Sequence, residues 1–398
     1  MTKDKAVIFL DRSIEYLLYA LIASIPISNA AIEISFSLAL VAFLIKKVLK
    51  PDFRFVKNLP HLFVLLFFGF CTLSLFNSGE FLNKSLRALF SKWLEYILIF
   101  ILAEDTLNTP KRLRNAAFIL LAVSALIGID GIVQQFRGID FLRQRILISR
   151  ISATFQNQNN FSAYLVPILL LVTSLVFSPQ LKKQFRFILF FLWSLLGVCL
   201  IFTFTRSAWL GFLIGLVLML FLSRKIKIAI PLICVFIIIL ISIPALRQRL
   251  TYTFQPGGDE ARLALSYSAL EMIKENPLLG KGLGTFMDHF PKYPASKALI
   301  KHGGYYAHNC FLQIWAEIGL FGLLSFLLFI GAVLYKGIRI FWGNQLPGQS
   351  QAVLLGLICA IFGFLVHSFF DTQLYSLQLS ALFWFLLGIT ASFAREGL

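Results

Sequence analysis

Four polar side chains stand at the start of an apolar run that continues to Tyr335. They are His308, Asn309, Gln313 and Glu317. Ionisable groups inside a bilayer cost about 2.5–3.5 kcal/mol on insertion scales, so residues of this kind mark functional sites. A histidine, with an ordinary pKa of about 6.5, suits proton transfer near neutral pH. The alternative for His308 is a helix-end histidine that bonds a neighbouring loop.

Arginines form a second group that could take part in binding or catalysis. They recur in connections on the face that we predict to be external. These arginines are Arg137, Arg143, Arg145, Arg150, Arg206, Arg247, Arg249 and Arg262. The planar guanidinium binds phosphate oxygens in bidentate fashion, whereas lysine offers a point charge. They indicate a cradle for a phosphorylated substrate. The alternative is that they are interfacial arginines that bind lipid headgroups.

Arg206 is the strongest single case in this group. It lies between two apolar runs with almost no loop to lift it out of the bilayer. A guanidinium in that position needs an anionic partner from the ligand or the protein. Glu33, Glu317 and Asp371 are the protein candidates.

Arg150 leads an amide-rich segment that contains Asn157 and Asn159 and runs into the next apolar stretch. Amides at this position suit hydroxyl-rich ligands such as sugars. They equally suit capping of the helix that follows. Both interpretations remain open from the residues alone.

The sequence lacks the motifs of nucleotide binding, of metal-dependent diphosphate chemistry and of zinc or disulfide sites. There is no Walker A loop, and Gly280-Lys281-Gly282-Leu283-Gly284 follows a predicted helix, so it is a helix stop and turn and not a dinucleotide motif. No DxD cluster is present to hold Mg²⁺ against a diphosphate, and Asp259-Glu260 and Glu33 are weak metal candidates. The five cysteines are scattered singly, which favours neither a disulfide framework nor a zinc site. We therefore expect no metal and no cofactor.

The composition indicates the environment in which these residues lie. Of 398 residues, 58% are hydrophobic and 14% are charged, with 43 phenylalanines and a mean hydropathy of +0.81. A bilayer accommodates that much apolar surface, whereas a soluble core does not. The chain is therefore expected to be a single polytopic membrane domain over residues 1–398.

The apolar runs predict an all-α integral membrane protein with about twelve transmembrane helices, because a bilayer core needs about 20 apolar residues per helix. The predicted spans lie near residues 14–30, 31–49, 60–77, 87–103, 116–135, 160–178, 186–205, 207–223, 226–245, 308–335, 351–369 and 377–394.

The lysine-rich connections share one face with both ends of the chain. By the positive-inside rule this face is cytoplasmic, which also accounts for the net charge of +17 without a nucleic-acid partner. The opposite face carries one large loop, residues 246–307, between spans 9 and 10. This loop opens with a Pro256-Gly257-Gly258 break.

Within that loop, Asp259 to Asn276 predicts an amphipathic helix that lies on the membrane surface or over the bundle. Its apolar face would consist of Leu263, Tyr267, Leu270 and Ile273.

With these residues in place, the chain resembles the O-antigen ligase/polymerase superfamily of bacterial envelope enzymes. The matching pieces are Arg150 to Asn160, Thr205-Arg206-Ser207-Ala208-Trp209, Glu260-Ala261-Arg262 through Gly284, and His308-Asn309 through Gly319. They occur in the expected order over residues 150–335, and the ordered set is more specific than any one piece.

The resemblance implies a GT-C-like helical fold and an inverting, metal-independent glycosyltransferase in the bacterial inner membrane. Its donor would be an undecaprenyl-diphosphate-linked glycan at the periplasmic face. A ligase joins this glycan to lipid A–core, whereas a polymerase lengthens it on its own carrier. The single large loop favours the ligase. Membrane lipids are the further partners expected.

The resemblance also assigns roles to residues. The essential arginines and histidine of the family correspond to Arg206, Arg262 and His308, with Arg150 as a diphosphate contact. Further candidate contacts to the diphosphate or glycan are Arg145, Asn157, Asn159 and Asn309. Gln313 and Glu317, spaced at four-residue steps from Asn309, would support the site from one helix face.

This assignment agrees with the chemistry. Transfer from a glycosyl diphosphate builds negative charge on the departing group, which clustered arginines stabilise where it develops. The acceptor hydroxyl needs a base, and His308 is the first candidate, with His289 and His302 as substitutes in the same loop. His61 and His367 are predicted to be structural.

Three other functions stay open. A polymerase of the same superfamily is the nearest, and a metal-dependent oligosaccharyltransferase that uses Glu33 is more distant. A lipid-linked glycan transporter also has about twelve spans, but it would show broken helices in paired halves, and no such pairing is visible here.

Overall fold

The computed structural model describes residues 2–51, 58–251, 260–293, 306–343 and 346–393. Over these residues the chain is all-helical, and the only β-type pairing is an isolated bridge between Ile139 and Ile146. The Pro256-Gly257-Gly258 break and His302 lie outside the described residues.

Over the described residues the bundle contains twelve successive helical stretches, and each overlaps one of the predicted apolar runs. They are α1 (Lys3–Ser24), α2 (Asn29–Leu49), α3 (Leu59–Ser74), α4 (Leu82–Ala88) continued through η4 (Leu89–Trp93) into α5 (Leu94–Thr106), α6 (Pro110–Arg137), α7 (Gln158–Val176), α8 (Lys183–Phe202), α9 (Arg206–Leu222), α10 (Ala229–Ser242), α14 (Cys310–Gly343), α15 (Gly348–Ser368) and α16 (Leu377–Ser392).

Length and composition qualify six helices among the described residues as candidate membrane spans. They are Leu59–Asn77, Pro110–Arg137, Gln158–Val176, Lys183–Phe202, Cys310–Gly343 and Gly348–Ser368. Shorter apolar helices, including α9 and α16, stand among them. A polytopic membrane protein is thus confirmed, while the number of twelve spans stays a prediction.

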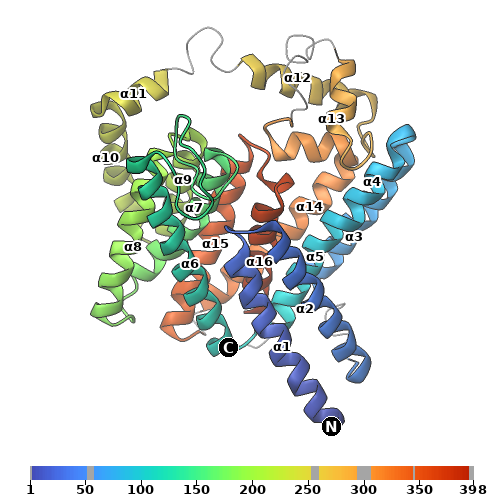
Figure 1. Cartoon of the computed structure of the whole chain (residues 1–398), viewed down its shortest axis with the longest axis horizontal. Coiled ribbons are helices and arrows are strands. Elements are labelled where there is room, and N and C mark those ends of the chain that lie inside the picture. Colours follow the sequence, from blue (N-terminus) through green and yellow to red (C-terminus); the bar gives the residue numbers. More distant parts are fainter. Residues whose placement is uncertain (1, 52–57, 252–259, 294–305, 344–345, 394–398) are drawn as a thin grey trace.

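A separate group of helices lies at one end of the bundle, opposite the start of α1 (Figure 1). It contains α11 (Pro244–Thr251), α12 (Glu260–Glu275), α13 (Phe286–His289) and η7 (Phe290–Lys292). We call the part from Glu260 to Tyr293 the cap. Its core consists of Leu265, Ala269, Met272, Phe286 and Phe290, packed with Ala316 of α14.

The predicted helix in the large loop is present as α12, and most of its predicted apolar face is exposed. Leu263, Tyr267 and Leu270 are 57%, 61% and 40% exposed, whereas Ile273 is buried. The helix instead buries Leu265, Ser268, Ala269 and Met272. Small residues at 268 and 269 allow a close approach on this buried side. The exposed side chains of Leu263, Tyr267 and Leu270 agree with a position on the membrane surface, which stays a prediction.

Glycine controls how α9 meets α15. A Cβ on Gly211 would lie 2.7 Å from the carbonyl oxygen of Gly363 and 3.3 Å from Cβ of His367. Real side chains do not tolerate the first distance, so only glycine permits this contact. The close approach places the start of α9, at Arg206, beside the end of α15.

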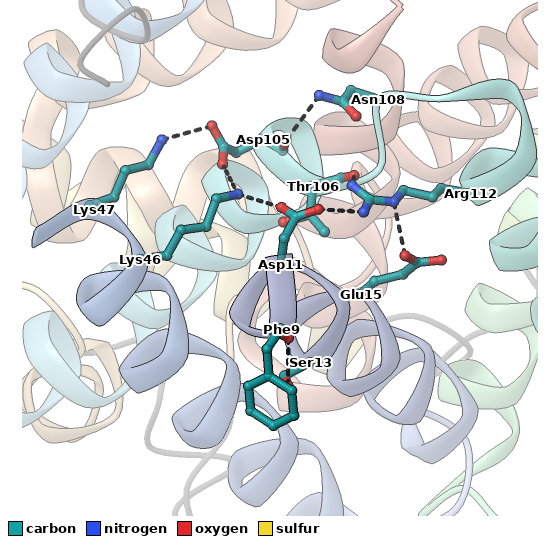
Figure 2. A network of polar contacts seen from close by, with 10 residues as sticks. All are labelled: Phe9, Asp11, Ser13, Glu15, Lys46, Lys47, Asp105, Thr106, Asn108 and Arg112. Carbon is teal, nitrogen blue, oxygen red and sulfur yellow. Dashed lines mark hydrogen bonds and ion pairs between the residues drawn. The ribbon is translucent and has the colours of Figure 1, made fainter. Parts of the chain in front are cut away.

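The end of the bundle that carries the start of α1 has a network of ion pairs (Figure 2). Lys46 of α2 bonds Asp11 of α1 at 2.6 Å and Asp105 of α5 at 3.3 Å, and Lys47 bonds Asp105 at 3.0 Å. Arg112 of α6 bonds both Asp11 and Glu15. These pairs join four helices, α1, α2, α5 and α6, at the ends that meet the predicted lysine-rich face.

Candidate active site

His308 lies directly before α14 and faces a carboxylate that comes from the turn after α15. Its Nδ1 is 3.0 Å from Oδ1 of Asp371, with side chains 30% and 12% exposed. His308 has φ of +50°, a left-handed conformation that a residue with a Cβ adopts rarely and at functional sites. The next residue, Asn309, accepts the N–H groups of Phe311 and Leu312 and so caps α14.

Asp371 is itself held from several directions. Asn159 of α7 donates its Nδ2 to Oδ2 at 2.7 Å, and the N–H of Thr372 donates to Oδ1 at 2.9 Å. Burial acts to raise the pKa of Asp371, but the hydrogen bond and charge of His308 outweigh it and hold that pKa below its ordinary value. The carboxylate therefore remains ionised and fixes the orientation of the His308 ring.

The same chain of contacts reaches the arginine turn. Thr205 donates its hydroxyl to Oδ1 of Asn159 at 3.5 Å, and Arg206 follows as the first residue of α9. Arg150 donates Nη1 to the carbonyl of Phe204 at 3.3 Å. Phe204 has φ of +49°, which turns the chain sharply between α8 and α9. Arg150 and Arg206 thus flank one turn, next to the group that orients His308.

Arg262 belongs to the cap. It is half-buried near the start of α12, and its charge acts on His367 of α15, one turn before Asp371. The three residues that the resemblance marked as essential, Arg206, Arg262 and His308, therefore lie around the end of α15.

Glu317 anchors the cap to α14. Its oxygens accept the N–H groups of Gly284 at 2.9 Å and Phe286 at 3.3 Å, Nε2 of Gln313 at 3.2 Å, and the hydroxyl of Tyr375 at 3.0 Å. Oε1 of Gln313 accepts the N–H of Ala307. Glu317 is thus bound to the glycine-rich turn, and the suggestion that it pairs with an arginine is wrong.

The glycine-rich turn docks where α14 is broken. Gly319 has φ of +74° and ψ of 179°, and a Cβ there would lie 2.0 Å from the carbonyl oxygen of Leu278. The freed backbone is re-bonded by the cap, since Lys281 N–H donates to Ala316, Gly282 N–H to Glu317, and Leu320 N–H to Pro277. Only glycine allows this conformation and this approach.

Two other candidates have local contacts within their own segment. Arg145 donates Nη1 to the carbonyl of Phe155, and its N–H donates to Asp140. Asn157 is the N-cap of α7, since its Oδ1 accepts the N–H of Asn160 at 2.9 Å. Capping, one of the two interpretations left open for the amides, applies to Asn157, while Asn159 contacts Asp371.

Of the other histidines that the structure describes, His367 lies one turn before Asp371 and its charge acts on that carboxylate, whereas His61 and His289 belong to other parts of the protein. His61 faces Glu104 at 2.7 Å in the bundle, and His367 is buried in α15. His289 lies in the cap, half-buried on α13. Among the described residues no group of three or more His, Cys, Asp and Glu side chains is arranged to hold a metal ion.

Sequence reasoning missed the role of Asp371, which it treated only as a partner for Arg206. Its position, in a short external connection after a predicted span, was the available signal. Tyr375, four residues further on, was not recognised at all. Burial and then the charge of Glu317 raise the pKa of Tyr375, so its hydroxyl keeps the proton that it donates to Glu317.

A comparison with known families can now be set beside this geometry. Residues 189–327 match the family model described as O-antigen ligase. This match supports membership of the O-antigen ligase superfamily. The matched segment contains Arg206, Arg262 and His308, whereas Arg150, Asn159 and Asp371 lie outside it. No curated protein matches the chain.

Membership confirms the resemblance and supports an enzyme of the ligase and polymerase type over a transporter. It also supports a bacterial membrane protein that handles a lipid-linked glycan and a glycan acceptor. The family match does not distinguish ligase from polymerase.

Proposed function

We propose that this protein is an O-antigen ligase-type glycosyltransferase. It moves a glycan from undecaprenyl diphosphate to a sugar hydroxyl of lipid A–core, with inversion and without a metal ion. The protein lies in the inner membrane with both termini on the cytoplasmic side. The site around His308 and the large loop that contains the cap then face the periplasm.

The observation that carries this proposal is the contact between His308 and Asp371, extended through Asn159 and Thr205 to the arginine turn. A carboxylate on Nδ1 selects the tautomer in which Nδ1 carries the proton and Nε2 is an acceptor. Nε2 is then the base for the acceptor hydroxyl.

The reaction is a single displacement. The acceptor oxygen attacks C1 of the first sugar while His308 Nε2 takes the hydroxyl proton. The bond between C1 and the diphosphate oxygen breaks, and the diphosphate leaves with the electron pair. Asp371 stabilises the imidazolium that forms and does not itself take the proton.

Arg206, Arg262 and Arg150 act on the departing diphosphate. Guanidinium groups bind phosphate oxygens with charge-assisted hydrogen bonds, which strengthen as negative charge develops. The carbonyl of Phe204 accepts a hydrogen bond from Arg150 and so helps to orient it. Asn309, Gln313 and Glu317 fix the start of α14 and the cap, so that His308 and Arg262 meet the same substrate.

The decisive experiment incubates the purified protein with undecaprenyl-diphosphate glycan and separate acceptors. Transfer to lipid A–core supports the ligase. Chain growth on the carrier would identify the polymerase instead, with the same donor chemistry. A folded protein that performs neither reaction contradicts the proposal. Persistence of activity in EDTA tests the metal-independent mechanism, and its loss would favour the oligosaccharyltransferase alternative.

A further inference from the structure

The cap contains a polar cavity that the proposed reaction does not use. Its volume is about 640 Å³. Residues from α12, the glycine-rich turn and the α13–η7 segment line it, namely Glu271, Lys274, Glu275, Lys281, His289 and Lys292. Tyr293 completes the wall.

Two buried polar atoms in this wall have no hydrogen-bond partner. They are Oε2 of Glu271 and Nε2 of His289. Burial, together with the charges of Lys292 and Lys281, lowers the pKa of His289, so the ring is neutral at pH 7. The ring also bonds the backbone of Lys281. With Nδ1 as the donor in that bond, Nε2 is a hydrogen-bond acceptor like the Glu271 oxygen.

Buried acceptors without partners are costly, about 1–3 kcal/mol each, unless a ligand or water supplies donors. Sugar hydroxyls are donors of the right kind.

The lysines of the cavity add a second requirement on the ligand, namely negative charge. Lys281 pairs with Glu275, and Lys292 lies 3.2 Å from the exposed Glu80 and 5.3 Å from the ring of Phe81. Three lysines and two glutamates line the cavity, which leaves it net positive with His289 neutral. A neutral sugar would match the two acceptors but not this positive charge.

The position of the cavity fits a remote part of a glycan. Glu271 follows Arg262 by nine residues on α12, which corresponds to about 14 Å along the helix. The glycine-rich turn that supplies Lys281 is bonded to Glu317 of α14. The cavity is thus fixed to the site, yet too far away to touch the reacting bond.

From these observations we infer that the cap cavity binds an acidic sugar unit, one that carries a phosphate or a carboxylate, of the glycan handled by this protein. Glu271 and His289 accept from its hydroxyls, and Lys274 and Lys292 bind its anionic group. Its role as a substrate subsite rests on the proposed function, whereas the binding itself does not. The acidic sugar unit can belong to the donor glycan or to the acceptor glycan.

Binding is tested with the full chain in lipid nanodiscs, using ligand-observed NMR with a hexose 6-phosphate, a hexuronic acid and the neutral hexose. The acidic sugars are expected to bind saturably and the neutral hexose about tenfold more weakly, in line with loss of one charge-assisted hydrogen bond. Lys274→Met and Glu271→Met are expected to weaken binding of the acidic sugars about tenfold. Lys84→Met is the control, because Lys84 bonds Asp288 on the same side of the protein but does not line the cavity.

Four results would overturn the inference: no saturable binding, equal binding of the neutral hexose, unchanged binding in both cavity variants, or equally tight binding of inorganic phosphate alone. Thermal unfolding of each variant checks that it is folded. His308→Ala separates the two proposals. If it keeps transfer activity, the proposed function fails while the binding result stands. If it loses transfer but still binds acidic sugars, both stand.

The subsite role has its own measurement. Glu271→Met and Lys274→Met are expected to reduce transfer of a long glycan severalfold and to leave transfer of a single sugar unit unchanged, because only the long glycan reaches the cavity. An equal effect on both substrates would contradict the role as a substrate subsite.

Discussion

The two ends of the bundle use charge in opposite ways. At the end with the start of α1, the network of Figure 2 pairs three basic residues with three acidic ones, namely Lys46, Lys47 and Arg112 with Asp11, Glu15 and Asp105. At the other end, Arg150 is oriented by a backbone carbonyl, and His308 is placed by Asp371. The first arrangement neutralises its charges, whereas the second holds cationic groups in defined positions.

The comparison teaches that charge balance separates a structural cluster from a reactive one. A carbonyl orients a guanidinium and leaves its charge available to an anion, whereas a carboxylate cancels it. The residue types follow the same division, because lysine dominates the network and arginine dominates the site. Substitutions in the site should therefore affect mainly the rate of glycan transfer, and substitutions in the network mainly the free energy of unfolding.

The largest effect is expected at the reactive end. His308→Ala should lower the rate of glycan transfer by about 10²–10⁴-fold, the usual contribution of a general base. Arg206→Lys should lower it by about 10²–10³-fold, since the planar fork is lost although the charge remains. Both are measured as kcat for transfer to lipid A–core. Near-normal rates in both variants, in a protein that is inserted and folded, would show that the site is wrongly placed.

Asp371→Asn should have the next largest effect, about a hundredfold on kcat, because the amide no longer favours the tautomer with a proton on Nδ1. It should also change the acid stability. The lowered pKa of Asp371 stabilises the fold above the ordinary aspartate value of about 3.9, and this contribution disappears as pH falls through the lower folded-state value.

Thermal unfolding between pH 6 and pH 3 measures this contribution. The native protein should lose more stability over that range than Asp371→Asn does. Equal slopes for the two proteins would indicate that His308 and Asp371 are not coupled in solution.

Gly319→Ala should give an intermediate effect on both activity and stability. The Cβ would collide with Leu278, and the backbone conformation is accessible only to glycine, so the free energy of unfolding should fall by about 2–4 kcal/mol. Activity per folded molecule should fall with it as the cap detaches. Gly331→Ala on the same helix is the matched control, because a Cβ there meets nothing within 4 Å.

The smallest effect on activity is expected from the network. Asp105→Asn removes one acceptor of both Lys46 and Lys47 in a place that is 9% exposed, so the free energy of unfolding should fall by about 1–2 kcal/mol. The kcat of the folded fraction should stay unchanged. A loss of kcat larger than that of Asp371→Asn would remove the distinction between the two ends.

Much of this arrangement could be predicted from the sequence. Runs of apolar residues placed the helices, because bilayer thickness fixes their length. The polar residues inside those runs, His308 and Arg206, stood out because of their cost in that environment. The order of motifs then indicated the superfamily, which the family match confirms.

The partners of these residues could not be predicted in the same way. Asp371 meets His308 only because the end of α15 lies beside the start of α14, and no spacing in the chain encodes that. The partners of Glu317 could not be predicted because two of the four are backbone N–H groups, which leave no trace in residue types. The packed face of α12 could not be predicted, because the small residues Ser268 and Ala269 form part of it and periodicity arguments weigh large side chains.

The break at Gly319 has a consequence for how this protein can be recombined with its relatives. Residues 310–318 of α14 are bonded to residues 277–286 of the cap, while the helix beyond Gly319 packs in the bundle on α3. A chimera that exchanges the large loop alone would separate these two segments. Exchanges that cross over at Gly319, and so move residues 277–286 together with residues 310–318, keep the bonded pair from a single parent.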